Sequence, residues 1–199
     1  MNDLILYGAG GHSFAMVELI RSINGLQVQH IYDDAPRNDF ILGVPVSKYN
    51  GQELNKASVC ISVGNNEVRK KLSQKINADF PILMHPSAVV YPSAEIGLGT
   101  TIMAQAVIDA SVSLGRFCIV NHNATVAHNA VVGDYCHIAI NAAIAGGVTI
   151  GEGTLVGAGS VVLPGIKVGV GVVIGAGAVV TKDIPNGATV YGNPGKIIK

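Results

Sequence analysis

The feature that most constrains this chain is an aliphatic residue at every sixth position from Val90 to Val180, without a break. The positions are Val90, Ile96, Ile102, Ile108, Leu114, Val120, Val126, Val132, Ile138, Ile144, Ile150, Val156, Val162, Val168, Ile174 and Val180. Small residues fill most positions four further along. An α-helix repeats about every 3.6 residues and an exposed strand about every 2, so neither explains this period. The pattern is typical of the hexapeptide repeats that form a parallel β-helix.

A second period supports this interpretation. Glycine recurs once in every three hexapeptides, each time directly after an aliphatic residue, at Gly97, Gly115, Gly133, Gly151 and Gly169. Three hexapeptides therefore make one triangular coil. Successive coils should stack about 4.8 Å apart, as neighbouring strands do. We expect a prism that is held together by hydrogen bonds between coils and by stacked aliphatic columns.

Composition narrows the range of functions. The formal charge of the 199-residue chain is zero and no Lys/Arg cluster occurs, which argues against a nucleic-acid or anionic-membrane surface. Only 13% of the residues are charged, against about 25% in typical domains, so we expect prism faces to be buried against other subunits. No apolar run approaches the ~20 residues of a membrane span, and no basic segment precedes the first apolar one. These features predict a soluble, cytoplasmic protein.

The three cysteines, Cys60, Cys118 and Cys136, lack the spacing of a metal site. Cys118 and Cys136 are one coil apart in the small-residue column, which makes them neighbours on successive coils. We expect them to be reduced, buried residues that fill space in the core.

The first eighty residues follow another pattern. Strands are expected at residues 4–7, 28–32 and 59–63, and helices at 14–23 and 67–76. This order predicts a Rossmann-like βαβαβ unit of the α/β class. We place its boundary with the β-helix near residues 81–86, giving a nucleotide-binding domain at 1–82 and a β-helix domain with a C-terminal tail at 83–199.

A glycine-rich turn, Gly8–Ser13, links the first strand to the first helix. Such a turn can hold a phosphate at the helix N-terminus, although the dinucleotide fingerprint requires glycine where Ser13 stands. Asp33 and Asp34 lie about 20 residues further on, where a ribose-binding acid is expected. The alternative is a tight turn with no ligand. His12 is either a ligand contact or a capping residue.

These segments together resemble a known family. The motifs are Leu6–His12, Tyr32–Asp34, Ser62–Lys71, the hexapeptides and the closing Gly192–Lys196. In this order they are similar to the sialic acid O-acetyltransferase (NeuD-like) family, which includes the bacterial nucleotide-sugar N-acetyltransferases of the PglD and perosamine type. The resemblance implies a left-handed β-helix, a homotrimer with active sites between subunits, and acetyl-CoA as donor. The implied acceptor is a nucleotide-linked amino sugar of bacterial surface-glycan biosynthesis, held by the N-terminal domain.

The resemblance also assigns roles to residues. His128 matches the catalytic base, which takes a proton from the sugar amine as the nitrogen attacks the thioester. Gly146 lies three hexapeptides beyond His128, so the period alone places it at nearly the same corner of the next coil. With the acetyl-CoA that the resemblance implies, its backbone N–H would face the thioester carbonyl. The resemblance implies His137 as an acetyl-CoA contact, together with Gly146. Ala158 and Ala176 are also three hexapeptides apart, and we expect them to leave space for the pantetheine arm on the same side as His128 and Gly146. The substrate contacts implied are Gly8, Gly10, Gly11, His12, Asp33, Asp34, Gly64 and Asn65.

The chain departs from the family pattern at two positions. An acidic residue usually follows the catalytic histidine, and here Asn129 follows His128. A neutral amide orients the ring but does not balance the charge of the imidazolium. Either the base is weaker or another acid supplies the charge, and Asp134 is a candidate that the sequence does not place. The family's Asn-Thr pair is Asn121-His122 here, which makes His122 an alternative base or a sugar contact.

Other functions fit parts of the sequence. Hexapeptide trimers also form γ-type carbonic anhydrases, whose zinc is held by three histidines, and His122, His128 and His137 are candidates. The nucleotide-type domain has no place in such an enzyme, so we expect no metal. A sugar O-acetyltransferase and a non-catalytic scaffold are further alternatives. The sequence leaves the sugar and the nucleotide base open between UDP and GDP, with a preference for a UDP-4-amino-4,6-dideoxy sugar.

Overall fold

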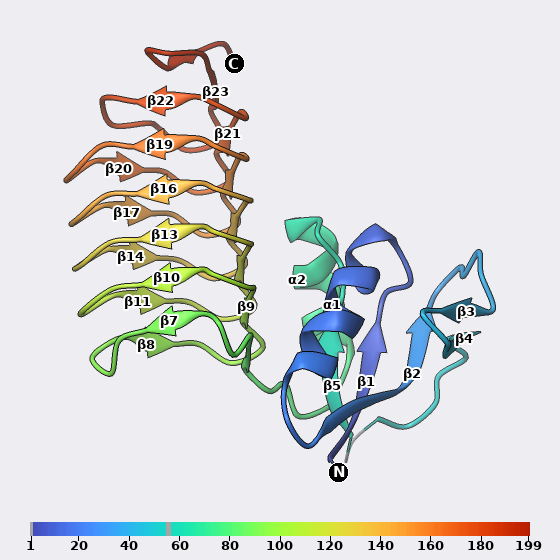
Figure 1. The fold of residues 1–199 in the computed structure, drawn as a ribbon. Helices are drawn as coiled ribbons and strands as arrows, with labels where there is room; N and C mark the ends of the chain where they lie inside the picture. The colour runs from blue at the N-terminus through green and yellow to red at the C-terminus, as the bar shows by residue number, and fades with distance from the viewer. Residues whose placement is uncertain (1, 55–56) are drawn as a thin grey trace.

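The computed structural model describes residues 2–54 and 57–199. It contains an N-terminal domain of helices and strands, followed by a three-sided parallel β-helix whose coils stack in one direction (Figure 1). The N-terminal domain lies against one side of the lower coils (Figure 1). This architecture confirms the predicted fold class.

The N-terminal domain is built on a five-stranded sheet with the order β3-β4-β2-β1-β5. Its elements are β1 (Asn2–Tyr7), α1 (Gly11–Ser22), β2 (Leu26–Asp33), β3 (Phe40–Ile41), β4 (Val44–Lys48), β5 (Ser58–Ile61) and α2 (Asn66–Lys75). β1 pairs in parallel with β2 and β5, as a Rossmann-like unit requires. Residues Leu4, Leu6 and Ile31 of the sheet pack against Met16 and Ile20 of α1.

The connection after β2 differs from the predicted βαβαβ order. Among the residues that the structure describes between β2 and β5, no helix forms. The chain instead makes an antiparallel pair, β3 and β4, and β4 then adds to the edge of the sheet in parallel with β2. Leu42 and Gly43 turn the pair with φ values of 49° and 79°. Pro45 disfavours a helix here, and β4 is a short strand of five residues that lies between β3 and β2.

The β-helix has three sheets. The eight-stranded sheet, which faces the N-terminal domain, consists of β6 (Leu83–Met84), β9 (Thr101–Ile102), β12 (Ile119–Val120), β15 (His137–Ile138), β18 (Leu155–Val156), β21 (Val173–Ile174), β23 (Thr189–Tyr191) and β24 (Lys196–Ile197). The six-stranded sheet consists of β7 (Val89–Val90), β10 (Val107–Ile108), β13 (Thr125–Val126), β16 (Ala143–Ile144), β19 (Val161–Val162) and β22 (Val179–Val180). The five-stranded sheet consists of β8 (Glu95–Ile96), β11 (Ser113–Leu114), β14 (Val131–Val132), β17 (Thr149–Ile150) and β20 (Lys167–Val168).

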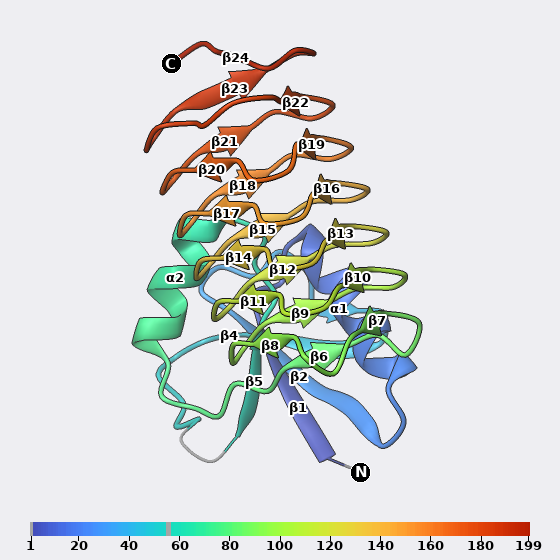
Figure 2. The same ribbon diagram turned by 90° about the vertical axis from the view of Figure 1, so that its left-hand side faces the viewer.

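Most strands of the β-helix pair in parallel with the strand one coil away, as the ladders in Figure 2 show. Thr125, for example, pairs with Val107 on the coil below and with Ala143 on the coil above. The second residue of each pair is the periodic aliphatic, and from Ile102 to Val180 these side chains are buried in one continuous core. The structure therefore confirms that three hexapeptides make one coil.

The corners of the prism have a period of their own. One residue in every six takes a left-handed backbone conformation, with φ between 53° and 68° from Gly99 to Gly159. Residues without a β-branched side chain occupy these positions: Gly99, Gln105, Ser111, Phe117, Asn123, Asn129, Tyr135, Asn141, Gly147, Gly153 and Gly159. Asparagine and glycine tolerate this conformation best. The left-handed backbone conformation at this corner therefore explains why asparagine follows His128.

Two columns of small residues allow the coils to stack closely. Cys118 and Cys136 are free, buried thiols in the small-residue column, as the sequence predicts. The glycine column is required by close stacking, because a Cβ on Gly115 would lie 2.5 Å from the backbone nitrogen of Asp134 on the next coil. The backbone of Asp134 cannot move away from an added Cβ unless the two coils separate.

We predict that Gly115→Ala destabilises the protein by more than about 2 kcal/mol, because the added methyl overlaps backbone rather than a mobile side chain. Gly159→Asn is the matched control. Its Cβ meets no atom within 4 Å, and Asn141 adopts the same left-handed conformation one coil below. Thermal unfolding of both variants tests this. Equal midpoints would show that coil stacking does not require glycine at position 115.

Candidate functional site

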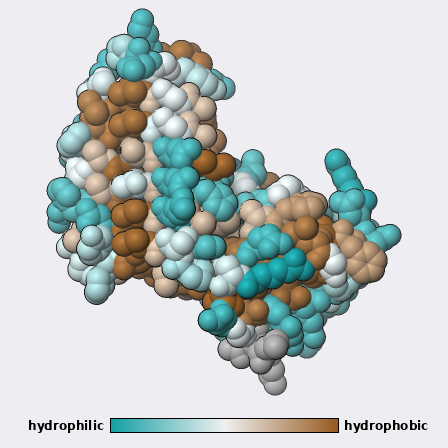
Figure 3. All heavy atoms as spheres, viewed as in Figure 1, coloured by the Kyte–Doolittle hydropathy of each residue, from teal (hydrophilic) through white to brown (hydrophobic). Residues whose placement is uncertain are grey.

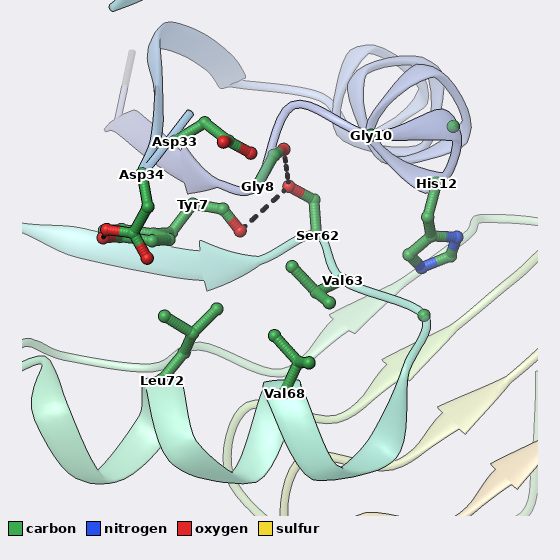
Figure 4. A pocket seen from close by; sticks show the side chains of 12 residues that line it. Tyr7, Gly8, Gly10, His12, Asp33, Asp34, Ser62, Val63, Val68 and Leu72 are labelled. Atoms are coloured by element: carbon green, nitrogen blue, oxygen red, sulfur yellow. Dashed lines mark hydrogen bonds between the residues drawn. The ribbon is translucent and has the colours of Figure 1, made fainter. Parts of the chain in front are cut away.

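A cavity of about 310 Å³ opens at the carboxyl ends of β1 and β5, beside the first turn of α1 (Figure 4). Its walls contain six of the predicted substrate contacts: Gly8, Gly10, Gly11, His12, Asp33 and Asp34. Gly64 completes the group from the turn after β5. Ligands of open parallel sheets bind at this edge, outside the carboxyl ends of the strands. We call this cavity the nucleotide pocket.

The three glycines of the turn differ in what the fold demands of them. Gly8 has φ of 115°, and a Cβ there would lie 2.6 Å from a methyl group of Val63, so only glycine fits. Gly10 and Gly11 would meet nothing within 4 Å and have ordinary φ values. Packing therefore does not explain them. Bare backbone at the start of α1 leaves room for a phosphate to approach the free N–H groups.

The first turn of α1 suits an anion in other respects. Its N-cap, Gly10, has no side chain to bond the helix amides, and no acidic residue lies in the first turn. Asp33 and Asp34 form the opposite wall of the pocket. Asp33 accepts backbone N–H bonds from Ala9 (2.7 Å) and Ala35 (2.8 Å), which fixes the glycine turn against the end of β2. Asp34 is exposed, and one of its oxygens accepts a 2.7 Å bond from the Tyr7 hydroxyl.

His12 lies at the inner end of the nucleotide pocket, toward the β-helix (Figure 4). Its Nε2 atom is buried and has no hydrogen-bond partner among the described residues. Burial, with a smaller contribution from the Arg69 cation, lowers the pKa of His12 to about 4. The ring is therefore neutral at physiological pH, and an unpaired buried nitrogen indicates a ligand contact rather than a cap.

A second groove of about 400 Å³ runs between the start of α2 and the eight-stranded sheet. It is lined by Gly64, Asn65 and His137 among others. Asn65 caps α2, because its side-chain oxygen accepts from Val68 N at 3.0 Å. His137 lies 3.2 Å from the amide of Asn121 and bonds the backbone of Gly64. Burial is the main cause that lowers the pKa of His137 to about 4. We call this the junction groove.

His128 lies elsewhere. It occupies the corner between β13 and β14, which is on the side of the prism away from the N-terminal domain (Figure 1). The ring is exposed, and its Nδ1 lies 3.0 Å from the side-chain oxygen of Asn129. Gly146 sits directly against the ring, because a Cβ there would lie 2.6 Å from Cε1 of His128. The Gly146 N–H has no backbone acceptor among the described residues. The His128 ring thus lies beside an N–H that has no acceptor among the described residues.

The remaining predicted residues are at other corners. Ala158 and Ala176 are exposed at the corner where His122 lies, between the eight-stranded and six-stranded sheets. They are not on the side of His128 and Gly146, because that corner joins the six-stranded and five-stranded sheets. Asp134 is at the third corner, where both its oxygens bond Arg116 at 2.7 to 3.0 Å. Within one chain, Asp134 and His128 therefore lie at different corners.

The chain thus forms two separate groups, the nucleotide pocket with the junction groove, and the pair of His128 and Gly146. Three residues that build the first group were assigned no role from the sequence, although the family motifs contain them: Tyr7, Ser62 and Arg69. Ser62 bonds the carbonyls of Tyr7 and Gly8, tying β5 to the glycine turn. No pattern in the sequence distinguishes these side chains from ordinary core or surface residues.

Within the described residues, no three His, Cys, Asp or Glu side chains are grouped closely enough to hold a metal ion. None of the described helices has both the length and the apolar character of a membrane span.

Comparison with known proteins agrees with this geometry. Residues 3–76 match the PglD N-terminal domain, residues 129–163 match the bacterial transferase hexapeptide model, and residues 147–182 match the hexapeptide repeat of succinyl-transferase. The acetyltransferase domain of PglB from Neisseria gonorrhoeae FA1090 is 35% identical with a TM-score of 0.92, and the alignment covers 100% of both chains. The chain belongs to the PglD and perosamine-type family.

Further members of the PglD family support the assignment. The structure of PerB from Caulobacter crescentus in complex with CoA and GDP-perosamine is 33% identical with a TM-score of 0.91, covering 100% of this chain and 98% of that one. The UDP-N-acetylbacillosamine N-acetyltransferase of Bacillus subtilis (strain 168) is 36% identical over 113 residues, 52% of each chain. The alignment therefore spans about half the length of this curated relative.

The pKa values of His12 and His137 predict how stability depends on pH. Both are lowered to about 4 in the folded protein, against about 6.5 in an unfolded chain, so between these values the unfolded state binds more protons. Their contribution to stability is complete above pH 6.5 and is lost as pH falls toward 4. We expect His137→Gln to flatten the dependence of unfolding free energy on pH in this window by about one proton. Denaturant unfolding across this window measures the slope, and an unchanged slope would contradict the prediction.

Proposed function

We propose that the protein transfers the acetyl group of acetyl-CoA to the amino group of a nucleotide-linked amino sugar. The observation that carries this proposal is the likeness over the whole chain to relatives that were solved with acetyl coenzyme A, in PglB, and with CoA and GDP-perosamine, in PerB. The groups that such a reaction needs are present in this chain, although they lie in two places.

The nucleotide pocket is the proposed acceptor site. The pyrophosphate would lie on the bare turn of Gly10 and Gly11, where α1 presents free N–H groups and the positive end of its dipole. Asp33 and Asp34 would accept hydrogen bonds from the ribose and the base. Both uracil and guanine offer N–H donors, so the base is open, with a slight preference for UDP. Gly64, His12 and Asn65 extend the site toward the junction groove and the sugar.

His128 is the proposed general base. With Nδ1–H donating to Asn129, Nε2 of the neutral ring is free to take a proton from the amine as its nitrogen attacks the thioester carbon. The Gly146 N–H would stabilise the oxyanion that forms. The tetrahedral species then collapses, the carbon–sulfur bond breaks, and the imidazolium returns its proton to the departing thiolate. Asn129 orients the ring without a carboxylate, and it also supplies the left-handed corner.

A homotrimer would unite the two groups of residues. In one chain the nucleotide pocket and His128 are on opposite sides of the prism, so the site is complete only if His128 of one subunit meets the pocket of another. An apolar column supports such packing. It runs along the six-stranded sheet (Figure 3) and consists of the outward side chains of Val89, Val107, Ala143, Val161 and Val179, interrupted only by Thr125. Such a partly exposed apolar stripe is typical of a subunit contact.

The same assembly would place the acetyl-CoA contacts. Gly146 on one subunit and the small corner residues Ala158 and Ala176 on its neighbour would form the walls of a cleft for the pantetheine arm, with His137 near its end. The size of alanine matters here because larger side chains would fill the cleft. Acetyl-CoA is a metabolite of the cell interior, so we propose that the enzyme works in the cytoplasm.

An acceptor panel tests the proposed function. Thiol release from acetyl-CoA is followed with UDP- and GDP-linked 4-amino-4,6-dideoxyhexoses, a 3-amino nucleotide sugar and free sialic acid. We expect turnover only with nucleotide amino sugars, and a product heavier by one acetyl group on nitrogen. Product mass and base-stability distinguish N- from O-transfer. Turnover with free sialic acid alone would favour the O-acetyltransferase alternative.

We predict that His128→Ala lowers turnover at least about a hundredfold, because a positioned base contributes roughly 10²–10⁴-fold. The ring is exposed and lies outside the buried core of the coils, so the oligomer should stay intact by size-exclusion chromatography with light scattering. Retention of most activity in this variant, together with an inactive His122→Ala, would move the base to His122.

A further inference from the structure

Arg69 is the largest fully buried side chain of the described residues, with 1% of its surface exposed. It lies on α2 in the sequence Asn66–Lys71, where the pattern suggests a solvated basic face. Its neighbours Lys70 and Lys71 are not buried. Arginine is almost never fully buried without a partner, so this position calls for an explanation.

Every hydrogen-bond acceptor of the guanidinium is neutral. Nε donates to Phe117 O at 2.8 Å. Nη1 donates to the carbonyls of Val63 and Gly64, each at 3.1 Å. Nη2 donates to Asn66 Oδ1 and Tyr135 O at 2.8 Å, and to Cys136 O at 3.3 Å. The ion pairs found among the described residues do not include Arg69.

These acceptors come from both domains. Val63 and Gly64 form the turn after β5, and Gly64 belongs to both the nucleotide pocket and the junction groove. Phe117 and Tyr135 are left-handed corner residues on two successive coils of the β-helix, and their rings stack with centroids 5.6 Å apart. The planar guanidinium of Arg69 therefore holds the Val63–Gly64 turn, which borders both cavities, against the β-helix. Lysine has no such fork and could satisfy only part of this set.

The same residue affects the junction histidines. After burial, the Arg69 cation is the largest cause that lowers the pKa of both His12 and His137. His137 also bonds Gly64, the residue whose carbonyl Arg69 holds. Burial lowers the pKa of Arg69 itself only to about 10, so the group stays charged at neutral pH.

On these contacts, we propose that Arg69 is a positioning residue for the transfer reaction, holding the Val63–Gly64 turn at the distance from the β-helix that aligns the acceptor sugar with the acetyl donor. This inference rests on the proposed function. Its basis is the shared turn, because a shift of Gly64 moves a wall of the nucleotide pocket and a wall of the junction groove together. Displacements of about 1 Å can cost roughly a hundredfold in rate.

The test compares Arg69→Lys and Arg69→Met with Arg116→Met, using acetyl-CoA and the acceptor of highest turnover in the panel. Arg116 is exposed and is bonded to Asp134, so its variant controls for loss of an arginine near the same coils. We expect both Arg69 variants to lose at least about tenfold in kcat/KM for the nucleotide sugar, with a smaller change for acetyl-CoA. Arg69→Met should also raise the pKa values of His12 and His137, measured by NMR titration, whereas Arg69→Lys keeps the cation and should leave them low.

A third variant, Asn66→Ala, keeps the inference testable if the Arg69 variants fail to fold. It removes one neutral acceptor of Arg69 and the 2.9 Å bond to Gly153 O, but leaves the buried cation and the rest of the clamp. We expect an oligomer of normal size with a severalfold higher KM for the nucleotide sugar. Wild-type kinetics in both Asn66→Ala and Arg69→Lys would overturn the inference. An inactive wild-type protein would instead contradict the proposed function, so the two failures are distinguishable.

Discussion

The close stacking of one coil on the next is the constraint on which the rest of the structure depends. Backbone approaches backbone so tightly along the column from Gly97 to Gly151 that no Cβ fits, and the corners turn because one residue in six is left-handed. The hydrogen bonds between coils pair the backbone along all three sheets. A coil of three hexapeptides keeps the periodic aliphatics from Ile102 to Val180 inside, since a slip in the register would expose whole columns.

This rigidity fixes the chemistry of the corners. Because the length of the coil is constant, His128 has a single neighbour above it, and that neighbour is Gly146, where the lack of a side chain leaves space for the ring. The His128 carbonyl bonds Gly147 on the coil above, but the N–H of Gly146 has no such backbone partner among the described residues. A regular solenoid thus presents an imidazole and a hydrogen-bond donor side by side, and under the proposed function the rest of the site comes to that corner from a neighbouring subunit.

The sequence predicted the β-helix well because its period is enforced at every coil, and the pairing of His128 with Gly146 follows from arithmetic on that period. It predicted the N-terminal domain less well. The β3–β4 pair depends on a turn at Leu42 and Gly43 that has no periodic signal. Helix α1 begins at Gly11 rather than Phe14, because glycine at the N-cap gives no side-chain signature. The sequence prediction put Ala158 and Ala176 on the side of His128 and Gly146, and this was wrong. Both pairs have an 18-residue spacing, but that spacing shows only that the two members of a pair share a corner, and not that the two pairs share one.

Arg69 illustrates why the junction between the domains could not be predicted. Its burial depends on carbonyls of Phe117 and Tyr135, which are far away in the sequence and belong to residues that turn left-handed corners. Burying a cation costs less free energy when fixed carbonyl dipoles surround it than when it has no hydrogen-bond partners. The cation nevertheless keeps its net charge. The lining of the nucleotide pocket contains two aspartates and no lysine or arginine.

The positive charge that acts on a ligand in that pocket therefore comes from groups outside its lining. Lys75 approaches Asp34 at 3.5 Å at the outer end, where it is exposed and screened by water. At the inner end, beside His12, the α1 dipole and the Arg69 cation supply the positive potential, and Arg69 is buried away from solvent. An anionic group bound at the inner end would thus be attracted by charge that the fold fixes in place, and its binding should depend less on salt than a contact with a surface lysine.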